Sequence, residues 1–364
     1  MLCKELLMTE AKNKNLLFNF IWTFISFIFV ILIMELFLRL LPVVNPIPLK
    51  DTNYNLSENE IAGSFLPNRK GNHSLGRDFY VVNQYESNNF GFVSNIDYQL
   101  YSSPKFAVIG DSYVEAVQVP YEQSFAGRIQ NKFGSDQVYS FGISGAPLSQ
   151  YLEFADYAEK NFSPKSYIFI VVGNDFDESL CDYALRPGFS CFDKNFSLKA
   201  IPNEPTWWGG RLLRASSLVR YIVFNLQIDP RSIFSSSKKQ VKYAGNTEFK
   251  KPKEVVDKSV RAIEVFFNKL KKITKDKPVY FIFDSEREKI YSGSTQGVSY
   301  FSEMRKISMK KALEENYFVI DMENIFIEDY KINKKKFEFR TDGHWNSYSH
   351  NLVATSFNTI YNDD

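Results

Sequence analysis

The chain has 364 residues, of which 44% are hydrophobic, 16% aromatic and 24% charged. This length and composition allow a well-buried core in one large domain or two small ones. The formal net charge of +2 argues against a nucleic acid as the partner. Three cysteines are too few for a disulfide scaffold and show no metal-ligand spacing. A bridge between Cys181 and Cys191 is chemically possible in an oxidising compartment, but it is the less favoured of the two states.

Residues 16–34 form a nearly uninterrupted apolar run. About 20 such residues are what a helix needs to cross the core of a bilayer. The run is long and no small-residue cleavage site follows it, which favours a membrane anchor over residues 16–41 rather than a cleaved signal peptide. Three lysines lie among residues 1–15, so the positive-inside rule places this tail in the cytoplasm. We expect a single-pass protein of the inner (cytoplasmic) membrane, with its main domain in the periplasm or extracellular space.

After the anchor, residues 42–104 are rich in Asn, Pro, Gly and Tyr, which predicts a lead-in of short strands and turns. From residue 105 onward, apolar strands alternate with helices. The expected strands are 105–110, 137–142, 165–172, 278–284 and 317–322. The expected helices are 121–134, 147–162, 254–276, 302–317 and 347–361. The alternation predicts a parallel sheet covered on both faces, in a domain of residues 105–364 with an insertion at 176–253.

Polar motifs stand where several of these strands end, and ligands of parallel sheets bind at the carboxyl ends of the strands. The motifs are Gly110-Asp111-Ser112, then Gly142 with Ser144 and Gly145, then Gly173-Asn174-Asp175, and finally, beyond the fifth strand and a Lys-rich connection, Asp342-Gly343-His344. Each motif alone is weak evidence, because Gly-Asp-Ser is a common turn and a lone histidine is more often structural. Their order and placement together indicate a catalytic site.

This combination resembles the SGNH hydrolases, also called the GDSL esterase family, over roughly residues 105–350. The resemblance implies a three-layer α/β/α sandwich around a five-stranded parallel sheet. It also implies Ser112 as the nucleophile, His344 as the base and Asp342 as the acid that orients it. The backbone of Ser112, Gly145 and the amide of Asn174 would form the oxyanion hole.

General chemistry supports the same roles. A serine hydroxyl needs a base to become nucleophilic, and of three histidines only His344 has an acid close before it, as an orienting carboxylate requires. His350 is the second choice for the base, and His73 is expected to be solvated. The loss of one oxyanion donor typically costs about 100-fold or more in rate. The alternative for Asn174 is an Asx turn that closes the third strand.

The last motif differs from the usual family pattern, because one residue rather than two separates the acid from the histidine. The intervening residue is Gly343, which eases the turn that a contact between the two side chains needs. The shorter form resembles the SGNH-like domains of bacterial exopolysaccharide O-acetylation.

Four residues are candidate substrate contacts. Trp345 either lines a sugar site or fills the core. In the insertion, Trp207 and Trp208 stack on sugar rings or form a hydrophobic cap, of which the cap is favoured. Asp111 is the fourth candidate, next to the nucleophile.

The sequence thus predicts a membrane-anchored serine esterase or O-acetyltransferase that acts on acetyl esters of cell-envelope or exported glycans, without a cofactor or metal. Acyl transfer would require a separate multi-span membrane protein as acyl donor. Two alternatives stay open: a lipid or thioester esterase, and an inactive accessory protein of a glycan-modifying membrane complex.

Overall fold

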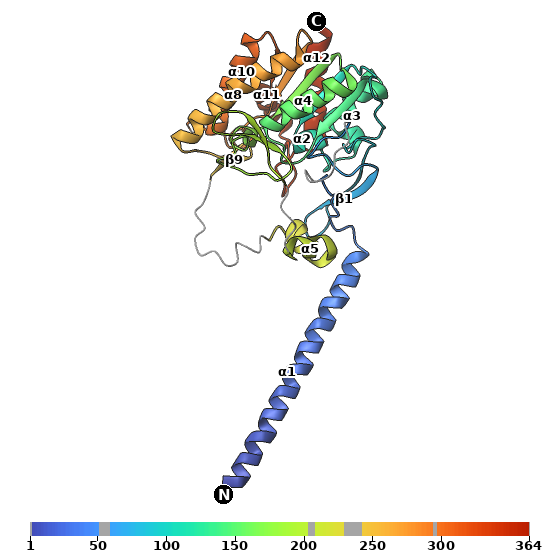
Figure 1. The fold of residues 1–364 in the computed structure, drawn as a ribbon, viewed down its shortest axis with the longest axis vertical. Coiled ribbons are helices and arrows are strands. Elements are labelled where there is room, and N and C mark those ends of the chain that lie inside the picture. The colour runs from blue at the N-terminus through green and yellow to red at the C-terminus, as the bar shows by residue number, and fades with distance from the viewer. Residues whose placement is uncertain (1, 51–58, 203–207, 229–241, 294–296, 364) are drawn as a thin grey trace.

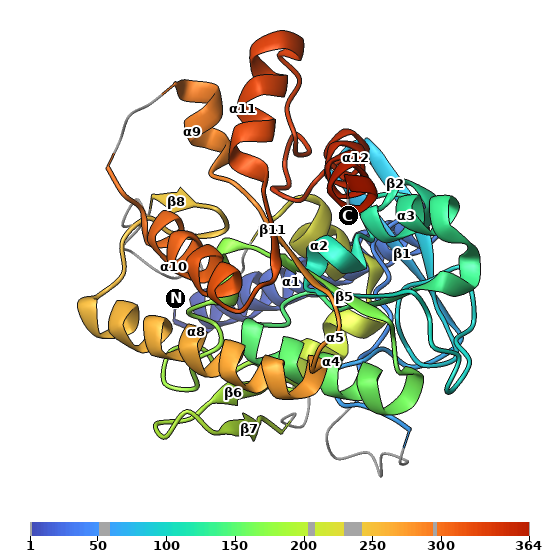
Figure 2. The same ribbon diagram turned by 90° about the horizontal axis from the view of Figure 1, so that it is seen from above.

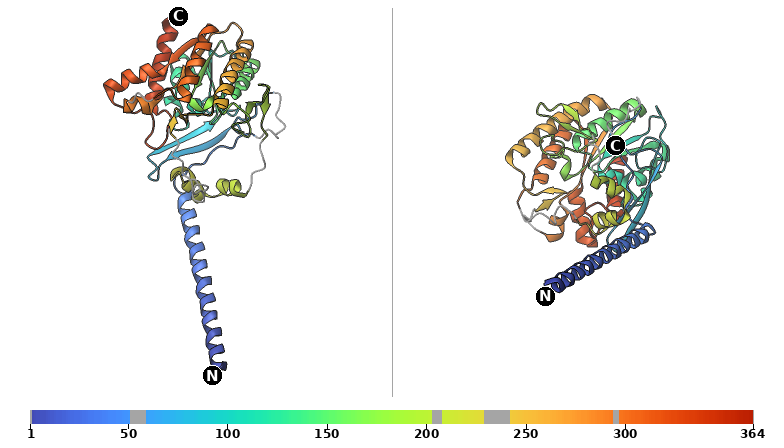
Figure 3. Two further views of the ribbon diagram at one scale, coloured as in Figure 1. Left: turned by 90° about the vertical axis from the view of Figure 1, so that its left-hand side faces the viewer. Right: turned by 60° about the horizontal axis from the view of Figure 1, so that its bottom comes forward.

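The computed structural model describes residues 2–50, 59–202, 208–228, 242–293 and 297–363. Helix α1 (Leu2–Arg39) projects from the rest of the molecule as one long rod (Figures 1 and 3). Its segment Phe18–Arg39 is long and apolar enough to cross a membrane, a property that membrane anchors and signal sequences share.

The five predicted strands form a single parallel sheet in the order β11-β10-β5-β3-β4. Their bounds are β3 (Phe106–Gly110), β4 (Val138–Gly142), β5 (Ser166–Val171), β10 (Val279–Phe283) and β11 (Phe318–Asp321). All of these strands except β11 are buried along their whole length, as expected of strands that helices cover on both faces.

Two groups of helices enclose the sheet (Figure 2). Helices α4 (Leu148–Phe162), α8 (Lys253–Thr274) and α10 (Tyr300–Glu314) contribute to the core on one face. Helices α3 (Phe125–Phe133), α11 (Met322–Asn333) and α12 (Ser347–Asp363) contribute to the core on the other. The result is the predicted three-layer α/β/α arrangement.

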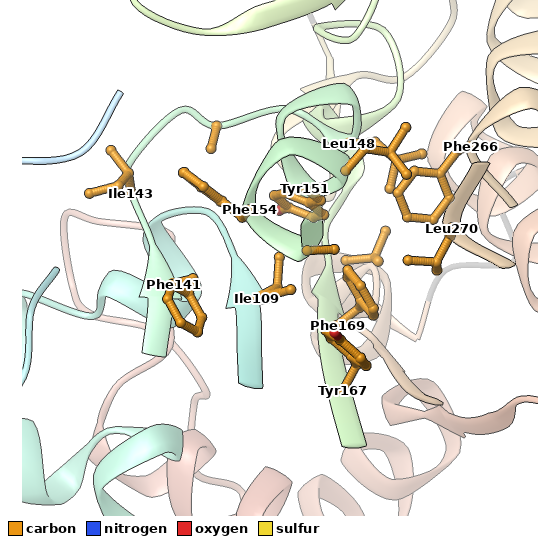
Figure 4. Close-up of a cluster of buried hydrophobic side chains, with 14 of the residues drawn as sticks. Ile109, Phe141, Ile143, Leu148, Tyr151, Phe154, Tyr167, Phe169, Phe266 and Leu270 are labelled. Atoms are coloured by element: carbon orange, nitrogen blue, oxygen red, sulfur yellow. The ribbon is translucent and has the colours of Figure 1, made fainter. Parts of the chain in front are cut away.

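The alternation of side chains along each strand explains how one sheet feeds two cores. Ile109 of β3 belongs to the first core, whereas its neighbour Val108 belongs to the second. Figure 4 shows the first core, in which Phe169 of β5 lies among side chains from the covering helices, such as Tyr151 and Phe266.

The segments outside the sandwich are short. The lead-in contains the antiparallel hairpin of β1 (Arg69–Leu75) and β2 (Val81–Ser87). The insertion contains β6 (Ser190–Phe192), β7 (Leu198–Ala200), α5 (Trp208–Ala215), α6 (Ser217–Arg220), the π-helix η4 (Tyr221–Asn225), β8 (Tyr243–Ala244) and β9 (Thr247–Glu248). The remaining short elements are α2 (Ser112–Glu115), α9 (Arg287–Ser292) and the 3-10 turns η1 (Tyr121–Gln123), η2 (Ser135–Gln137) and η3 (Gly173–Asp175).

One sequence prediction about helices needs correction, and one helix was not predicted. The helix expected at 121–134 begins at Phe125, because the side chain of Ser124 caps it by accepting from the backbone N–H of Gly127. The connection from the last strand to the Asp342 motif contains helix α11, which Asp321 caps, and the lysines at 334–336 follow the end of that helix.

The far end of α1 packs against the insertion, beside α5 (Figure 1). The carboxylate of Glu35 accepts hydrogen bonds from the backbone N–H groups of Ser217 (3.0 Å) and Leu218 (2.9 Å), at the start of α6. An anion at a helix N-terminus is favourable, because the first N–H groups of a helix have no partner within it. Asn72 of β1 also donates to the carbonyl groups of Pro42 and Val43. The chain that leaves α1 is therefore fixed to the domain rather than joined to it by a loose linker.

In the structure Cys181 and Cys191 form a disulfide. The state that the sequence favoured less is therefore the one observed. The bridge closes a short loop within the insertion, which also carries Arg186.

Candidate active site

Ser112 lies at the carboxyl edge of the sheet. Gly110 at the end of β3 pairs with Gly142 at the end of β4, so the two motifs that follow these strands start at the same level. A Cβ atom at Gly110 would lie 2.4 Å from Cγ2 of Val114, so the turn into α2 requires a glycine there. Asp111 then caps α2 by accepting from the backbone N–H of Tyr113 at 2.9 Å. The turn leaves Ser112 8% exposed, as the first residue of α2.

The structure brings Ser112, His344 and Asp342 together. Nε2 of His344 lies 2.7 Å from Oγ of Ser112. Nδ1 of the same ring contacts Oδ1 of Asp342, which also accepts from the backbone N–H of His344 at 2.9 Å. The spacing with one intervening residue therefore allows the acid to contact the histidine ring. This is the geometry of a serine with its base and of a base with its orienting carboxylate.

The electrostatics of the pair favour proton transfer to the histidine. Burial by itself would lower the pKa of His344, but the Asp342 carboxylate raises it above its ordinary value. Burial by itself would raise the pKa of Asp342, but its hydrogen bond with His344 holds that pKa below its usual range. Asp342 therefore stays ionised and stabilises the imidazolium form of His344.

Tyr113 fixes the turn that carries the histidine, a role that sequence analysis missed. Its hydroxyl donates to the carbonyl of Gly343 at 3.0 Å. It accepts from the amide of Asn246 at 2.7 Å and from Nη2 of Arg287 at 2.6 Å. Arg287 is buried and pairs with the equally buried Asp284 at 3.1 Å. No local pattern signals this network, because its members come from four separate parts of the chain.

The residues expected at the oxyanion hole lie at the ends of the neighbouring strands. Gly145 follows β4 with a φ of +80°, a left-handed conformation that favours glycine. The amide of Asn174, which follows β5, donates to the carboxylate of Glu178 at 2.9 Å. The turn at Asn174 is closed instead by Asp175, whose carboxylate accepts from the backbone N–H of Val172 at 2.8 Å. The Asx-turn interpretation of Asn174 is therefore wrong.

Several other candidates have structural roles. Trp345 is 1% exposed, and its indole N–H donates to Asp284 at 2.9 Å, so it fills the core and does not contact substrate. Asp111 is 1% exposed, its Oδ2 lies 3.2 Å from Oγ of Ser112, and its Oδ1 caps α2, so it too does not face a substrate. Trp207 lies outside the described residues, and for Trp208 the structure establishes only that α5 begins there.

The two other histidines are not bases for Ser112. His350 is buried, its Nδ1 accepts from the backbone N–H of Phe125 at 3.1 Å, and burial lowers its pKa to about 3. His73 was expected to be solvated, but it lies in β1, where burial lowers its pKa to about 4. It faces the same cavity as His344. Among the described residues, no cluster of His, Cys, Asp or Glu could hold a metal ion.

Two cavities flank the turn at Asp342-Gly343-His344. The first, of about 780 Å³, is bordered by Gly343, Asn246 and Arg287. The second, of about 520 Å³, is bordered by Asp342 and His344. Apolar side chains of the lead-in and of η4 form much of the wall of the second cavity, including Val44, Ile47, Phe65, Val223 and Phe224, and the polar residues Glu115 and Ser144 also border it. Both volumes lie within the range of sites for small ligands.

No protein-family model matches the chain, and no curated protein matches it either. Among solved structures, it is similar to a member of the lipolytic protein G-D-S-L family from Veillonella parvula, with 12% identity, a TM-score of 0.36 and coverage of 71% of this chain and 97% of that one. It is also similar to an alpha/beta hydrolase enzyme from the metagenome of Lake Arreo, with 11% identity, a TM-score of 0.38 and coverage of 71% and 94%. A gut microbial diltiazem-metabolizing enzyme shows 10% identity and a TM-score of 0.38 over 73% of this chain and 48% of that one. Likenesses this distant do not define an activity, which must be inferred from the geometry of the site.

Proposed function

We propose that this protein is a serine esterase or acyltransferase that works through an acyl-serine intermediate at Ser112. The observation that carries the proposal is the continuous contact from Oγ of Ser112 through the ring of His344 to the carboxylate of Asp342. Because all three groups are present and in contact, the accessory-protein alternative loses its main support, which was the shortened spacing of acid and histidine.

The reaction follows from these contacts. His344 takes the proton of Ser112 as Oγ forms a bond to the ester carbonyl carbon, and the carbonyl oxygen becomes an oxyanion. The backbone of Ser112 and Gly145, with the Asn174 amide, would stabilise that charge. The C–O bond to the leaving alcohol then breaks, and the alcohol oxygen takes the proton from His344. A water molecule or a second hydroxyl next gives its proton to His344 and attacks the acyl carbon. The bond from that carbon to Oγ then breaks, Oγ of Ser112 takes the proton back from His344, and the acyl group leaves as a free acid or a new ester.

We further propose that the site faces the outside of the cytoplasmic membrane, with α1 as the anchor. The apolar length of α1 supports the anchor. The disulfide supports an oxidising compartment, because such bonds are rare in the cytosol. In that location the substrate would be an acetyl ester of a cell-envelope or exported glycan. If a sugar hydroxyl rather than water accepts the acetyl group, a multi-span membrane protein would supply it.

A second candidate function is the hydrolysis of esters with longer acyl chains, such as those of lipids. The cavity of about 520 Å³ beside His344 favours it, since apolar side chains such as Ile47 and Phe224 form much of the wall. The cavity residues Val44 and Ile47 lie a few residues after helix α1, the proposed membrane anchor. An apolar cavity so close to the anchor suits an acyl chain better than an acetyl group alone.

The full-length protein in detergent, given p-nitrophenyl esters from acetyl to dodecanoyl, tests both candidates. We expect hydrolysis that Ser112→Ala and His344→Ala abolish. Preference for acetyl, with acetylated sugar formed when an oligosaccharide is added, would support glycan O-acetylation. Preference for chains of about eight carbons or more would support the lipid candidate. No hydrolysis above the level of the two folded variants would contradict the proposed esterase chemistry.

A further inference from the structure

The amide of Asn174 is held by a carboxylate. Nδ2 donates to Oε2 of Glu178 at 2.9 Å, and the backbone N–H of Glu178 donates to the carbonyl of Asn174 at 3.2 Å. An asparagine amide has two N–H groups, so one can be held by Glu178 while the second is able to donate to a substrate oxygen. Glu178 thus sets the direction of the side chain that would stabilise the oxyanion.

A carboxylate in this place carries an electrostatic cost. The negative charge of Glu178 acts on Asp111, the neighbour of Ser112. Burial is the largest cause that raises the pKa of Asp111 to about 6, and the charge of Glu178 contributes to the same increase. The side chain of Glu178 is only 16% exposed, so solvent screens it weakly. If the Glu178 carboxylate had no ion pair, it would repel the negative charge that forms on the carbonyl oxygen and so destabilise the transition state.

Arg186 supplies the compensating charge. Its guanidinium pairs with Oε1 of Glu178 through Nη2. Its other terminal nitrogen, Nη1, lies so near Gly145 that a Cβ atom there would be 2.7 Å from it. Arg186 therefore lies between the two loops that are expected to supply oxyanion donors. It pairs with the carboxylate that holds the Asn174 amide, and its other terminal nitrogen lies beside Gly145.

The insertion holds Arg186 in this position. The disulfide Cys181–Cys191 closes the loop that carries it. Within the loop, the backbone N–H of Phe189 donates to the carbonyl of Arg186 at 3.1 Å, and the N–H of Gly188 donates to the carbonyl of Ile201 at 2.8 Å. The bridge and these bonds fix the loop over the sheet edge.

We propose that Glu178 and Arg186 are positioning residues of the oxyanion site: Glu178 orients the Asn174 amide, and Arg186 cancels the charge of Glu178 and adds positive charge beside Gly145. The inference rests on the proposed function, because it concerns the transition state of that reaction. The pair acts on the charge that develops during reaction, so its loss lowers kcat and leaves KM nearly unchanged.

These charges predict a specific pattern among variants. Arg186→Ala leaves Glu178 unpaired, and we expect kcat to fall about 30-fold, somewhat less than for the loss of a direct oxyanion donor. Glu178→Gln keeps an oxygen that accepts from Asn174 but removes the charge, so its kcat should stay within about threefold of wild type. The double variant Glu178→Gln/Arg186→Ala should therefore recover at least about tenfold over Arg186→Ala. Recovery of this kind would not follow if Arg186 only stabilised the loop.

The experiment measures kcat and KM for p-nitrophenyl acetate with full-length protein, and Arg261→Ala is the control. Arg261 pairs with Glu264 on the exposed face of α8, away from the site, and we expect its loss to leave kcat unchanged. Conservative replacement by Arg186→Lys should retain more activity than Arg186→Ala.

The outcomes distinguish failure of the inference from failure of the proposed function. If the wild-type protein shows no Ser112-dependent turnover, the proposed function fails and this inference fails with it. If the wild type turns over and Arg186→Ala keeps its kcat, only the inference is overturned. The inference is also overturned if Arg186→Ala is impaired and the addition of Glu178→Gln does not restore its kcat.

Discussion

Replacing Asp342 by asparagine isolates the part of the site that depends on charge. The carboxylate both contacts Nδ1 of His344 and accepts its backbone N–H at 2.9 Å. An amide of the same shape can retain the backbone contact but no longer stabilises the imidazolium form. In serine triads this change costs about 10⁴-fold in kcat, which corresponds to about 5.5 kcal/mol of transition-state stabilisation.

The pH profile gives a second and independent readout of the same variant. Asp342 raises the pKa of His344 against the effect of burial, and the base is active only when neutral. Wild-type activity should therefore rise with pH through a pKa above the ordinary value of histidine, 6.5. Without the carboxylate, burial dominates, and the residual activity of Asp342→Asn should rise at a lower pH.

Steady-state hydrolysis of p-nitrophenyl acetate, followed from acidic to alkaline pH, measures both effects. Asp193→Asn is the matched control, because Asp193 caps an exposed turn by accepting from the backbone N–H groups of Asn195 and Ser197. A loss of less than tenfold in Asp342→Asn, with an unshifted pH profile, would refute the role of Asp342 as the orienting acid.

Three further predictions concern stability and the support of the site. Replacement of both bridged cysteines by serine should lower the free energy of unfolding by about 2–3 kcal/mol, the expectation for a short closed loop, and should lower the midpoint of thermal unfolding. Because His350 has a folded-state pKa of about 3 against 6.5 when unfolded, the unfolded state binds the proton first and stability falls as the pH drops below 6.5. Protonation of His350 in the unfolded state lowers the free energy of unfolding by about 2 kcal/mol at pH ~5. Urea unfolding at neutral pH and at that pH should therefore show a smaller drop in the free energy of unfolding for His350→Asn than for the wild type. Tyr113→Phe removes the acceptor of a buried guanidinium, so it should destabilise the protein by about 2–3 kcal/mol and lower kcat by loosening the turn at Gly343; unchanged unfolding and kcat would contradict this.

The sheet was predictable because its signals are local. Each strand is a short apolar run, and the helices between them carry periodic apolar faces, so the alternation alone indicates a parallel sheet. Ser112 and the expected oxyanion donors followed from the same logic, because motifs at the ends of parallel strands meet at one edge. His344 was singled out because it alone of the three histidines has an acid close before it, in a motif that resembles the last motif of the family. The contact between Asp342 and His344 is also local, since only one residue separates them.

The rest of the site depends on contacts that no local pattern encodes. Arg186 reaches Gly145 only because a disulfide and an insertion bring its loop over the sheet. Tyr113 and Arg287 meet across 174 residues of sequence, and nothing near either residue signals the other. Trp345 follows the histidine motif directly, yet its burial depends on a partner, Asp284, at the end of a different strand.

Trapping the acyl group on Ser112 tests the central claim most directly. Full-length protein is mixed with a p-nitrophenyl ester, quenched in acid within milliseconds to seconds, digested and examined by mass spectrometry. The proposed mechanism predicts one acyl group on the peptide that contains Ser112, accumulating in a burst with p-nitrophenol and absent from Ser112→Ala. Turnover of the ester with no burst and no acylated Ser112, or acylation that persists at another residue in Ser112→Ala, would contradict it.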